Sequence, residues 1–278
     1  MAQIYPQYLA EDRPYDPAYP ISDNETLEYY TGDGCLWGQI LVPAGSFTQP
    51  RPCVLLFHGF PGSSRNDDFA HALCRMGCVM LVPHHRGAIG SPGKYLVSNC
   101  IADIISLTNY VRSGMFVMKY NVDPDSIYLF GHSMGSNNIL NAAKQLPRVR
   151  GLILYAPYDP TYYLRHGKEE LLRELMDSAR FLNSDGPDAI YDDIAAHAEE
   201  WSFPNAFSAL KDKHLLCLSG AQDEVAPEHE MVLPLWNLLA AHPTEAVQRH
   251  VSYPTGHALM GHRASALQEI VRFLQDTL

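Results

Sequence analysis

The chain has 278 residues, of which 46% are hydrophobic and 18% charged, so it is long enough for one large α/β domain with an insertion. Its formal net charge of −11 argues against a nucleic-acid partner or an anionic membrane surface, because both would repel it. No stretch approaches the ~20 apolar residues of a membrane span, and the first residues lack the pattern of a secretory signal. We therefore expect a cytoplasmic protein with no membrane partner.

Cysteine usage agrees with a cytoplasmic location, and histidine spacing bears on metal binding. The six cysteines are scattered and form no CxxC pair, and most of them, such as Cys53 and Cys217, fall within apolar runs. Such thiols are expected to be small buried hydrophobes, which suits a reducing compartment. His84 and His85 are adjacent, but no third ligand follows at metal-binding spacing. The sequence thus predicts neither a metal nor another cofactor.

The first part of the chain predicts an arm, a hairpin and then alternating strands and helices. Residues 1–22 are rich in Pro, Tyr and acidic residues without a period, which indicates an arm on the surface or against the second subunit of a homodimer. Extended runs at 26–30 and 36–42, separated by Gly32-Asp33-Gly34, predict a hairpin at the edge of a larger sheet. Further strands are expected at 53–57, 78–82, 127–130 and 151–156, with helices at 69–76, at 99–118 and after residue 133. Strict alternation indicates a parallel sheet with right-handed crossovers.

The alternation breaks between residues 157 and 211, which carry no strand-like run. One helical stretch there has an apolar face from Leu171 to Leu182, and a second covers about 189–201. An insertion directly after a strand end lies over the site, so we interpret 157–211 as a helical cap on a core formed by 23–156 and 212–278. Most of its aromatic residues should form the core of the cap, while the candidates for substrate contact are Tyr158, Tyr162 and Trp201.

Residues 131–135, Gly-His-Ser-Met-Gly, have the form G-x-S-x-G between an apolar run and a helix-compatible segment. A strand that turns into a helix so quickly forces Ser133 into positive φ and lifts its side chain clear of the sheet. The flanking glycines fit because a Cβ at either position would collide with the neighbouring strand or helix. The N–H of Met134, at the start of the helix, is a candidate oxyanion donor. Taken alone, however, a Gly/Ser turn that opens a helix is also an ordinary cap.

His58-Gly59-Phe60 comes directly after the expected strand 53–57, at the edge of the sheet where ligands of open α/β folds bind. Gly59 permits close approach of the backbone, so the N–H of Phe60 is a candidate second oxyanion donor. Pro61 has no N–H and is excluded. His58 is interpreted as a brace for this loop. The alternative is a plain Gly/Pro turn.

An acid and a base are expected after the last two strands, at 214–219 and 246–252. Asp223 follows the first of these, although it could instead cap the helix that starts near Pro227. Its competitors are Glu224 nearby and Asp159 after the preceding strand. His257 lies on the loop after the final strand, where a general base could reach Ser133. The histidine at position 262, at the start of the closing helix, lacks the preceding turn.

The order Ser133, Asp223, His257, each immediately after a predicted strand, resembles the α/β-hydrolase superfamily over residues 25–278. This resemblance implies a mostly parallel, eight-stranded twisted sheet flanked by helices. Within the superfamily the chain resembles bacterial serine carboxylesterases with a short helical cap, a group that includes cinnamoyl and feruloyl esterases. Haloalkane dehalogenases carry Asp as nucleophile, hormone-sensitive-lipase types carry an HGGG loop, and prolyl-oligopeptidase relatives carry a large N-terminal propeller. The sequence departs from all three patterns.

The resemblance implies a serine hydrolase that cleaves small acyl or hydroxycinnamate-type esters through an acyl-enzyme. Its catalytic triad would be Ser133, Asp223 and His257, and its oxyanion hole the N–H groups of Phe60 and Met134. Peptide or amide cleavage, thioester hydrolysis and acyl transfer remain alternatives, because the triad sets the reaction and the cap sets the substrate. A non-catalytic ligand-binding protein of this fold is a third reading, against which a complete triad argues.

Overall fold

The framework of the protein is an eight-stranded sheet in the order β1-β2-β4-β3-β5-β6-β7-β8, seen in a computed structural model that describes residues 1–45, 49–63 and 65–278. The strands are β1 (Asp23–Thr31), β2 (Gly34–Val42), β3 (Arg51–Phe57), β4 (Val79–Pro83), β5 (Val122–His132), β6 (Gly151–Tyr155), β7 (His214–Gly220) and β8 (Gln248–Tyr253). The predicted hairpin is confirmed, since β1 and β2 pair antiparallel. β2 joins β4 antiparallel, and β3 to β8 are parallel, so their carboxyl ends share one edge.

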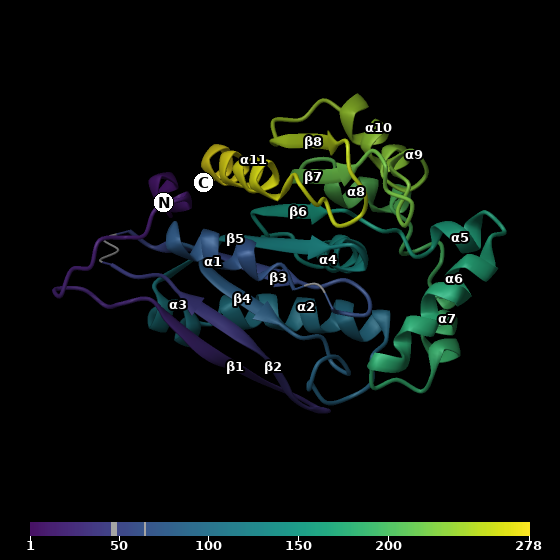
Figure 1. Ribbon diagram of the computed structural model, residues 1–278, viewed down its shortest axis with the longest axis horizontal. Helices are drawn as coiled ribbons and strands as arrows, with labels where there is room; N and C mark the ends of the chain where they lie inside the picture. Colours follow the sequence, from purple (N-terminus) through teal and green to yellow (C-terminus); the bar gives the residue numbers. More distant parts are fainter. Residues whose placement is uncertain (46–48, 64) are drawn as a thin grey trace.

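Helices cover both faces of this sheet (Figure 1). One face packs against α1 (Asp67–Arg75) and α11 (Arg263–Thr277). The other packs against α2 (Val97–Val111), α3 (Gly114–Tyr120), α4 (Met134–Ala143) and α10 (Leu233–Ala241). β5 alternates between the two cores, with Ile127 and Leu129 in one and Tyr128 and Phe130 in the other. Within the described residues, no helix has the length and apolarity needed to cross a membrane.

The helix predicted at 99–118 is in fact two helices. α2 ends at Val111, and Ser113 is extended at φ −62° and ψ 145° before α3 begins. The Ser113 Oγ accepts a hydrogen bond from the N–H of Phe116 at 3.3 Å. Serine at this position satisfies a free amide of the new helix, so a local cap overrides the continuous apolar pattern of the sequence.

Residues 157–211 form several short helices rather than the two predicted stretches. These are α5 (Tyr162–Arg165), α6 (Glu169–Met176), η2 (Asp177–Phe181), α7 (Pro187–Ala196), η3 (Pro204–Ala206) and α8 (Phe207–Leu210). Glycines with positive φ, Gly167 and Gly186, separate them. Leu171, predicted on the apolar face, is 46% exposed, whereas Leu172 and Met176 are buried. Figure 1 shows α5, α6 and α7 beyond the carboxyl ends of the strands.

The first and last parts of this segment are joined at Asp159, which follows β6 and is almost fully buried. Its carboxylate accepts hydrogen bonds from the N–H and hydroxyl of Thr161, from Arg165 and from the N–H of Phe203. Burial raises the pKa of Asp159, against the opposing effect of these donors.

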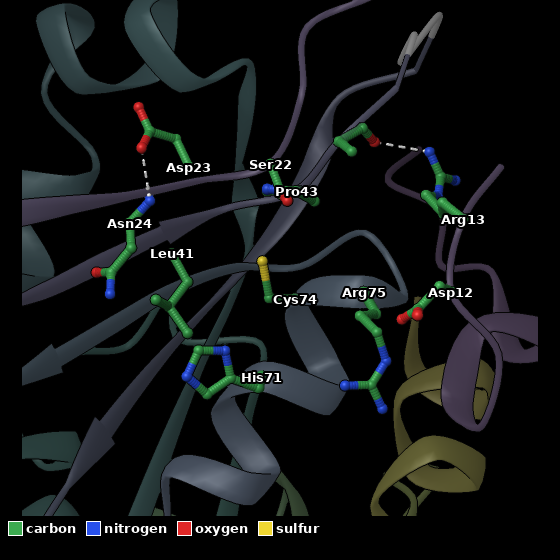
Figure 2. A pocket seen from close by; sticks show the side chains of 11 residues that line it. Asp12, Arg13, Ser22, Asp23, Asn24, Leu41, Pro43, His71, Cys74 and Arg75 are labelled. Atoms are coloured by element: carbon green, nitrogen blue, oxygen red, sulfur yellow. Dashed lines mark hydrogen bonds between the residues drawn. The ribbon is translucent and has the colours of Figure 1, made fainter. Parts of the chain in front are cut away.

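The N-terminal arm packs on its own chain. Ile4 is buried, the N–H of Tyr5 donates to Met76 O at 2.8 Å, and Arg75 donates to the carbonyl of Leu9 at 2.8 Å. The arm, α1, the start of β1 and the end of β2 line a surface cavity of about 450 Å³. Figure 2 shows the side chains around it, with Arg13 donating to the carbonyl of Ala44. This cavity lies at the amino end of the parallel strands, opposite the edge described next.

Candidate active site

The turn between β5 and α4 forces Ser133 into the backbone conformation that the sequence predicts, with φ 54° and ψ −123°. The N–H of Ser133 donates to Tyr155 O at 2.9 Å, which anchors the turn to β6. A Cβ on Gly131 would lie 2.4 Å from Gly135 O, and one on Gly135 would lie 2.6 Å from His58 O. Both positions therefore require glycine, because real Cβ atoms do not approach backbone so closely.

The structure brings Ser133, Asp223 and His257 together from the ends of three strands. The Oγ of Ser133 lies 2.8 Å from His257 Nε2, and His257 Nδ1 lies 2.7 Å from Asp223 Oδ2. A carboxylate only accepts, so Nδ1 carries the ring proton and Nε2 presents its lone pair to the serine hydroxyl. The side chain of Asp223 is 2% exposed and that of His257 21%, so the imidazole reaches solvent while the carboxylate does not. This arrangement can remove the proton of a nucleophilic serine.

The second oxygen of Asp223 fixes the orientation of the carboxylate. Asp223 Oδ1 accepts from the N–H of Val225 at 2.9 Å and from the N–H of Ala226 at 2.8 Å. Because α9 (Glu228–Met231) begins later, these bonds form a turn and do not cap the helix. Asp223 thus contacts the backbone through one oxygen and His257 through the other.

The competing residues lie elsewhere. Glu224 is exposed, and the carboxylate of Asp159 pairs with Arg165 at 2.9 Å. His262 stacks on Tyr253 with ring centroids 5.3 Å apart. Among the described residues, neither Asp159 nor Glu224 forms a hydrogen bond with His257.

The loop after β3 lies directly against the serine. A Cβ on Gly59 would lie 2.8 Å from Ser133 Cβ and 2.8 Å from His132 O, so this loop approaches the turn as closely as two backbones can. Neither Phe60 nor Met134 has a hydrogen-bond acceptor for its N–H among the described residues. Both amides thus remain candidate donors to an oxygen bound beside Ser133, as the sequence predicts.

His58, which the sequence predicts as a brace, forms hydrogen bonds within this loop and to the neighbouring loop. Its Nδ1–H donates to Gly59 O at 2.8 Å, and its Nε2 accepts the N–H of His85 at 3.2 Å. The His85 ring packs edge-on against that of His58 at 4.7 Å, and the His84 ring lies 6.2 Å from it. Burial lowers the pKa of His58 to about 4 and that of His84 to about 4, and it also lowers the pKa of His85. All three rings are therefore neutral at physiological pH.

No metal centre is found in the described part of the chain: none of its His, Cys, Asp and Glu side chains form a group of three or more that could hold an ion. His84 and His85 contribute instead to the packing around His58.

The three predicted substrate residues differ in their positions. The N–H of Tyr158 donates to Ser133 O at 3.2 Å, so this residue starts beside the serine. Its buried hydroxyl has no hydrogen-bond partner among the described residues. Tyr162 stacks on His166 and Trp201 on His197, each pair with ring centroids 4.1 Å apart. Trp201 O also accepts from Asn137 Nδ2 at 2.7 Å, which ties the insertion to α4.

The sequence places Tyr163 among the aromatic residues of the insertion without singling it out, and the two amides that orient Asp223 were not predicted. Tyr163 donates its hydroxyl to Val225 O at 3.5 Å and so connects α5 to the loop that carries Asp223. Nothing in the sequence distinguishes it from the other cap aromatics. The amides of Val225 and Ala226 could have been predicted, because Asp commonly accepts from an N–H two residues later.

Comparisons with known proteins identify the family and the fold. A family model described as Hydrolase_4, serine aminopeptidase S33, matches residues 48–199. The esterase YjfP of Escherichia coli (strain K12) is 26% identical over 195 residues, which cover 68% of this chain and 75% of that protein. The solved structure of AbyA5 has a TM-score of 0.68 at 18% identity and covers 92% of this chain and 75% of its own. A Pyrococcus furiosus esterase has a TM-score of 0.65 at 16% identity, covering 100% and 95%. These likenesses show the α/β-hydrolase fold that the sequence predicts.

Proposed function

Since this chain belongs to the serine aminopeptidase S33 family of α/β hydrolases, we propose that it is a serine hydrolase that cleaves carboxylic esters through an acyl-enzyme. Ser133 is the nucleophile, His257 the general base and acid, and Asp223 the residue that orients the imidazole. One observation supports these roles most: His257 lies 2.8 Å from the Ser133 hydroxyl and 2.7 Å from the Asp223 carboxylate. Two of the similar proteins are described as esterases, which supports the ester class.

The proposed reaction has two halves. Ser133 Oγ attacks the ester carbonyl carbon while its proton passes to His257 Nε2. The N–H groups of Phe60 and Met134 stabilise the resulting oxyanion, and losing one such donor typically costs ~3 kcal/mol. His257 then gives the proton to the leaving alcohol, and the acyl group stays on Ser133. Water attacks this acyl-enzyme with His257 again as the base, which releases the acid and restores the serine.

Residues 157–211 are proposed to act as a cap that selects small acyl or aromatic substrates. Tyr158 is the best candidate for direct contact with the substrate. Its backbone N–H is hydrogen-bonded to Ser133 O, and its buried hydroxyl has no hydrogen-bond partner among the described residues. Tyr162 and Trp201, which stack within the insertion, would shape the wall of the pocket.

Peptide-bond cleavage is the second candidate, because the matching family model is described as a serine aminopeptidase. The same triad can attack an amide carbonyl. The two candidates differ in the leaving group that His257 must protonate, an alcohol or an amine.

One set of assays separates them. Purified protein and Ser133→Ala are given p-nitrophenyl esters of graded acyl length, methyl ferulate and an aminoacyl p-nitroanilide. We expect ester turnover in the wild type and none above background in the variant, with the fold unchanged by circular dichroism. Anilide cleavage faster than every ester would favour the peptidase. Wild-type protein that turns over no substrate but binds one would overturn the proposal of an enzyme.

A further inference from the structure

A second cluster of polar side chains lies at the two ends of the loop that carries Asp223 and on the adjacent strand β8. It consists of Ser219, Glu228, His250 and Ser252 and is called here the Glu228 cluster. Ser219 Oγ lies 2.5 Å from Glu228 Oε1 and 2.7 Å from His250 Nε2. His250 Nε2 lies 2.9 Å from the same Glu228 oxygen, and the hydroxyl of Ser252 donates to Glu228 Oε2 at 3.0 Å.

The chemistry of these groups determines where the protons lie. A carboxylate only accepts, so the Ser219 hydroxyl donates to Glu228, and His250 must carry its proton on Nε2. Glu228 thereby receives donors from three side chains, and hydrogen bonds to an ionised acceptor are about twice as strong as neutral ones. Burial lowers the pKa of His250, although Glu228 opposes this effect. His250 Nε2 therefore acts as a donor to Glu228 rather than as a base.

The Glu228 cluster joins the two loops that meet at the active site. Ser219 is at the end of β7 and Glu228 at the start of α9, so their bond closes the loop between them, which contains Asp223. His250 and Ser252 lie on β8, the strand that leads into the loop of His257. One carboxylate thus holds the loop of Asp223 against the strand that precedes the loop of His257.

We propose that Glu228 is a positioning residue, which sets the distance between Asp223 and His257 by tying the loop of Asp223 to β8 through a carboxylate that is only 15% exposed. The inference rests on the proposed function, in which the Asp223 and His257 pair activates Ser133. Without the carboxylate, the buried hydroxyl of Ser219 would lose its acceptor and His250 would lose one of its two, a cost that the loop and the strand can relieve by moving apart. Small displacements of catalytic groups cost rate, since an error of 1 Å can lower it by about 10²-fold.

The test compares Glu228→Gln and Glu228→Ala with the matched control Glu25→Gln. Glu25 also accepts two strong donors, from Lys119 at 2.6 Å and Tyr120 at 2.8 Å, but it lies on β1 at the far edge of the sheet. We expect Glu228→Ala to lower kcat by about tenfold with KM changed by less than a factor of about two. Glu228→Gln, which keeps one acceptor oxygen, should fall between Ala and the wild type. Glu25→Gln should alter Tm and leave kcat unchanged.

Two further readouts separate positioning from stability. A carboxylate beside an imidazole favours its protonated form, so a looser pair should move the acid limb of the pH–rate profile to lower pH. The downfield proton resonance of His257 Nδ1–H should also broaden in Glu228→Ala. The rate at which a fluorophosphonate labels Ser133 reports the same loss of activation without any ester substrate.

The outcomes are distinct for each idea. Wild-type labelling at Ser133 without turnover of any ester would overturn the proposed substrate class alone, and the labelling rates of the Glu228 variants would still decide their role. Unchanged kcat, labelling rate and pH profile in Glu228→Ala, with only a lower Tm, would overturn the positioning role. If that variant fails to fold, Ser252→Ala, which removes one of the two contacts between Glu228 and β8, should show a smaller change in the same direction, and the lack of any change would count against the inference. Wild-type Ser133 that does not react with the probe would overturn both.

Discussion

His257 and a group of three other histidines lie at the same edge of the sheet, but their surroundings differ. His257 is 21% exposed at its side chain and donates to a carboxylate. His58, His84 and His85 are buried and pack against one another, and in the described residues no carboxylate pairs with any of them. His257 therefore has both a carboxylate partner and access to solvent, whereas the buried three remain neutral and support the loop beside Ser133. The partner and the access to solvent, rather than the side chain itself, decide which histidine can act as a base.

The largest effect is expected from removing the feature that sets His257 apart. Asp223→Asn should lower kcat by about 10⁴-fold, because an amide can favour the wrong tautomer of the imidazole. The fold and the Tm should change little, since the amide fills the same space. Steady-state kinetics with a p-nitrophenyl ester measures the effect. Glu224→Gln, an exposed neighbour, is the control and should keep wild-type activity; equal activity in Asp223→Asn would contradict the contrast between the two groups.

A smaller effect on kcat is expected from Gly59, which lies between His58 and Ser133. The Gly59→Ala side chain would lie 2.8 Å from Ser133 Cβ, so either the loop or the serine must shift. We expect kcat to fall by about 10²-fold, the cost of losing a well-placed oxyanion donor, while His257 keeps its partner. Gly32→Ala is the matched control, because no atom lies within 4 Å of a Cβ there. Full activity in Gly59→Ala would show that the oxyanion donors do not depend on this contact.

The smallest effect is on the pH dependence of the free energy of unfolding, and it comes from the buried histidine His58. The pKa of His58 is lowered to about 4 in the folded protein, below that of an unfolded histidine. The unfolded chain therefore binds more protons between about pH 6.5 and pH 4, and the free energy of unfolding should fall as pH is lowered through this window. The expected slope is about 1 kcal/mol per pH unit for one fully buried ring.

Urea denaturation at several pH values tests this slope. His58→Asn keeps a donor for Gly59 O and should lose one proton's share of the pH dependence. His229→Gln, whose side chain is 77% exposed, should keep the wild-type slope. An unchanged slope in His58→Asn would mean that His58 does not stay neutral in the fold.

Much of the sheet and the meeting of Ser133, Asp223 and His257 can be predicted from the sequence. Buried runs that alternate with helices indicate parallel strands, and parallel strands bring their carboxyl ends to one edge. Residues directly after β5, β7 and β8 must then lie close together, whatever their separation in the chain. Their roles in catalysis remain a prediction that kinetics must test.

Other features could not be predicted because they depend on contacts between distant segments. Leu171 fits an apolar helix face by spacing, yet short helices in the insertion rotate it to the surface. The break at Ser113 depends on a cap that competes with a continuous apolar pattern. The members of the Glu228 cluster look ordinary one by one, and only the register of β7 with β8 brings Ser219 beside Ser252.

The order of the site along the chain has a consequence during biosynthesis. Gly59 and Ser133 are made first, Asp223 much later, and His257 only in the loop before the last helix, α11. A growing polypeptide on the ribosome therefore contains Ser133 long before the imidazole that we propose as its base has been translated. Under the proposed mechanism, a product that terminates before residue 257 would carry the alcohol without its base.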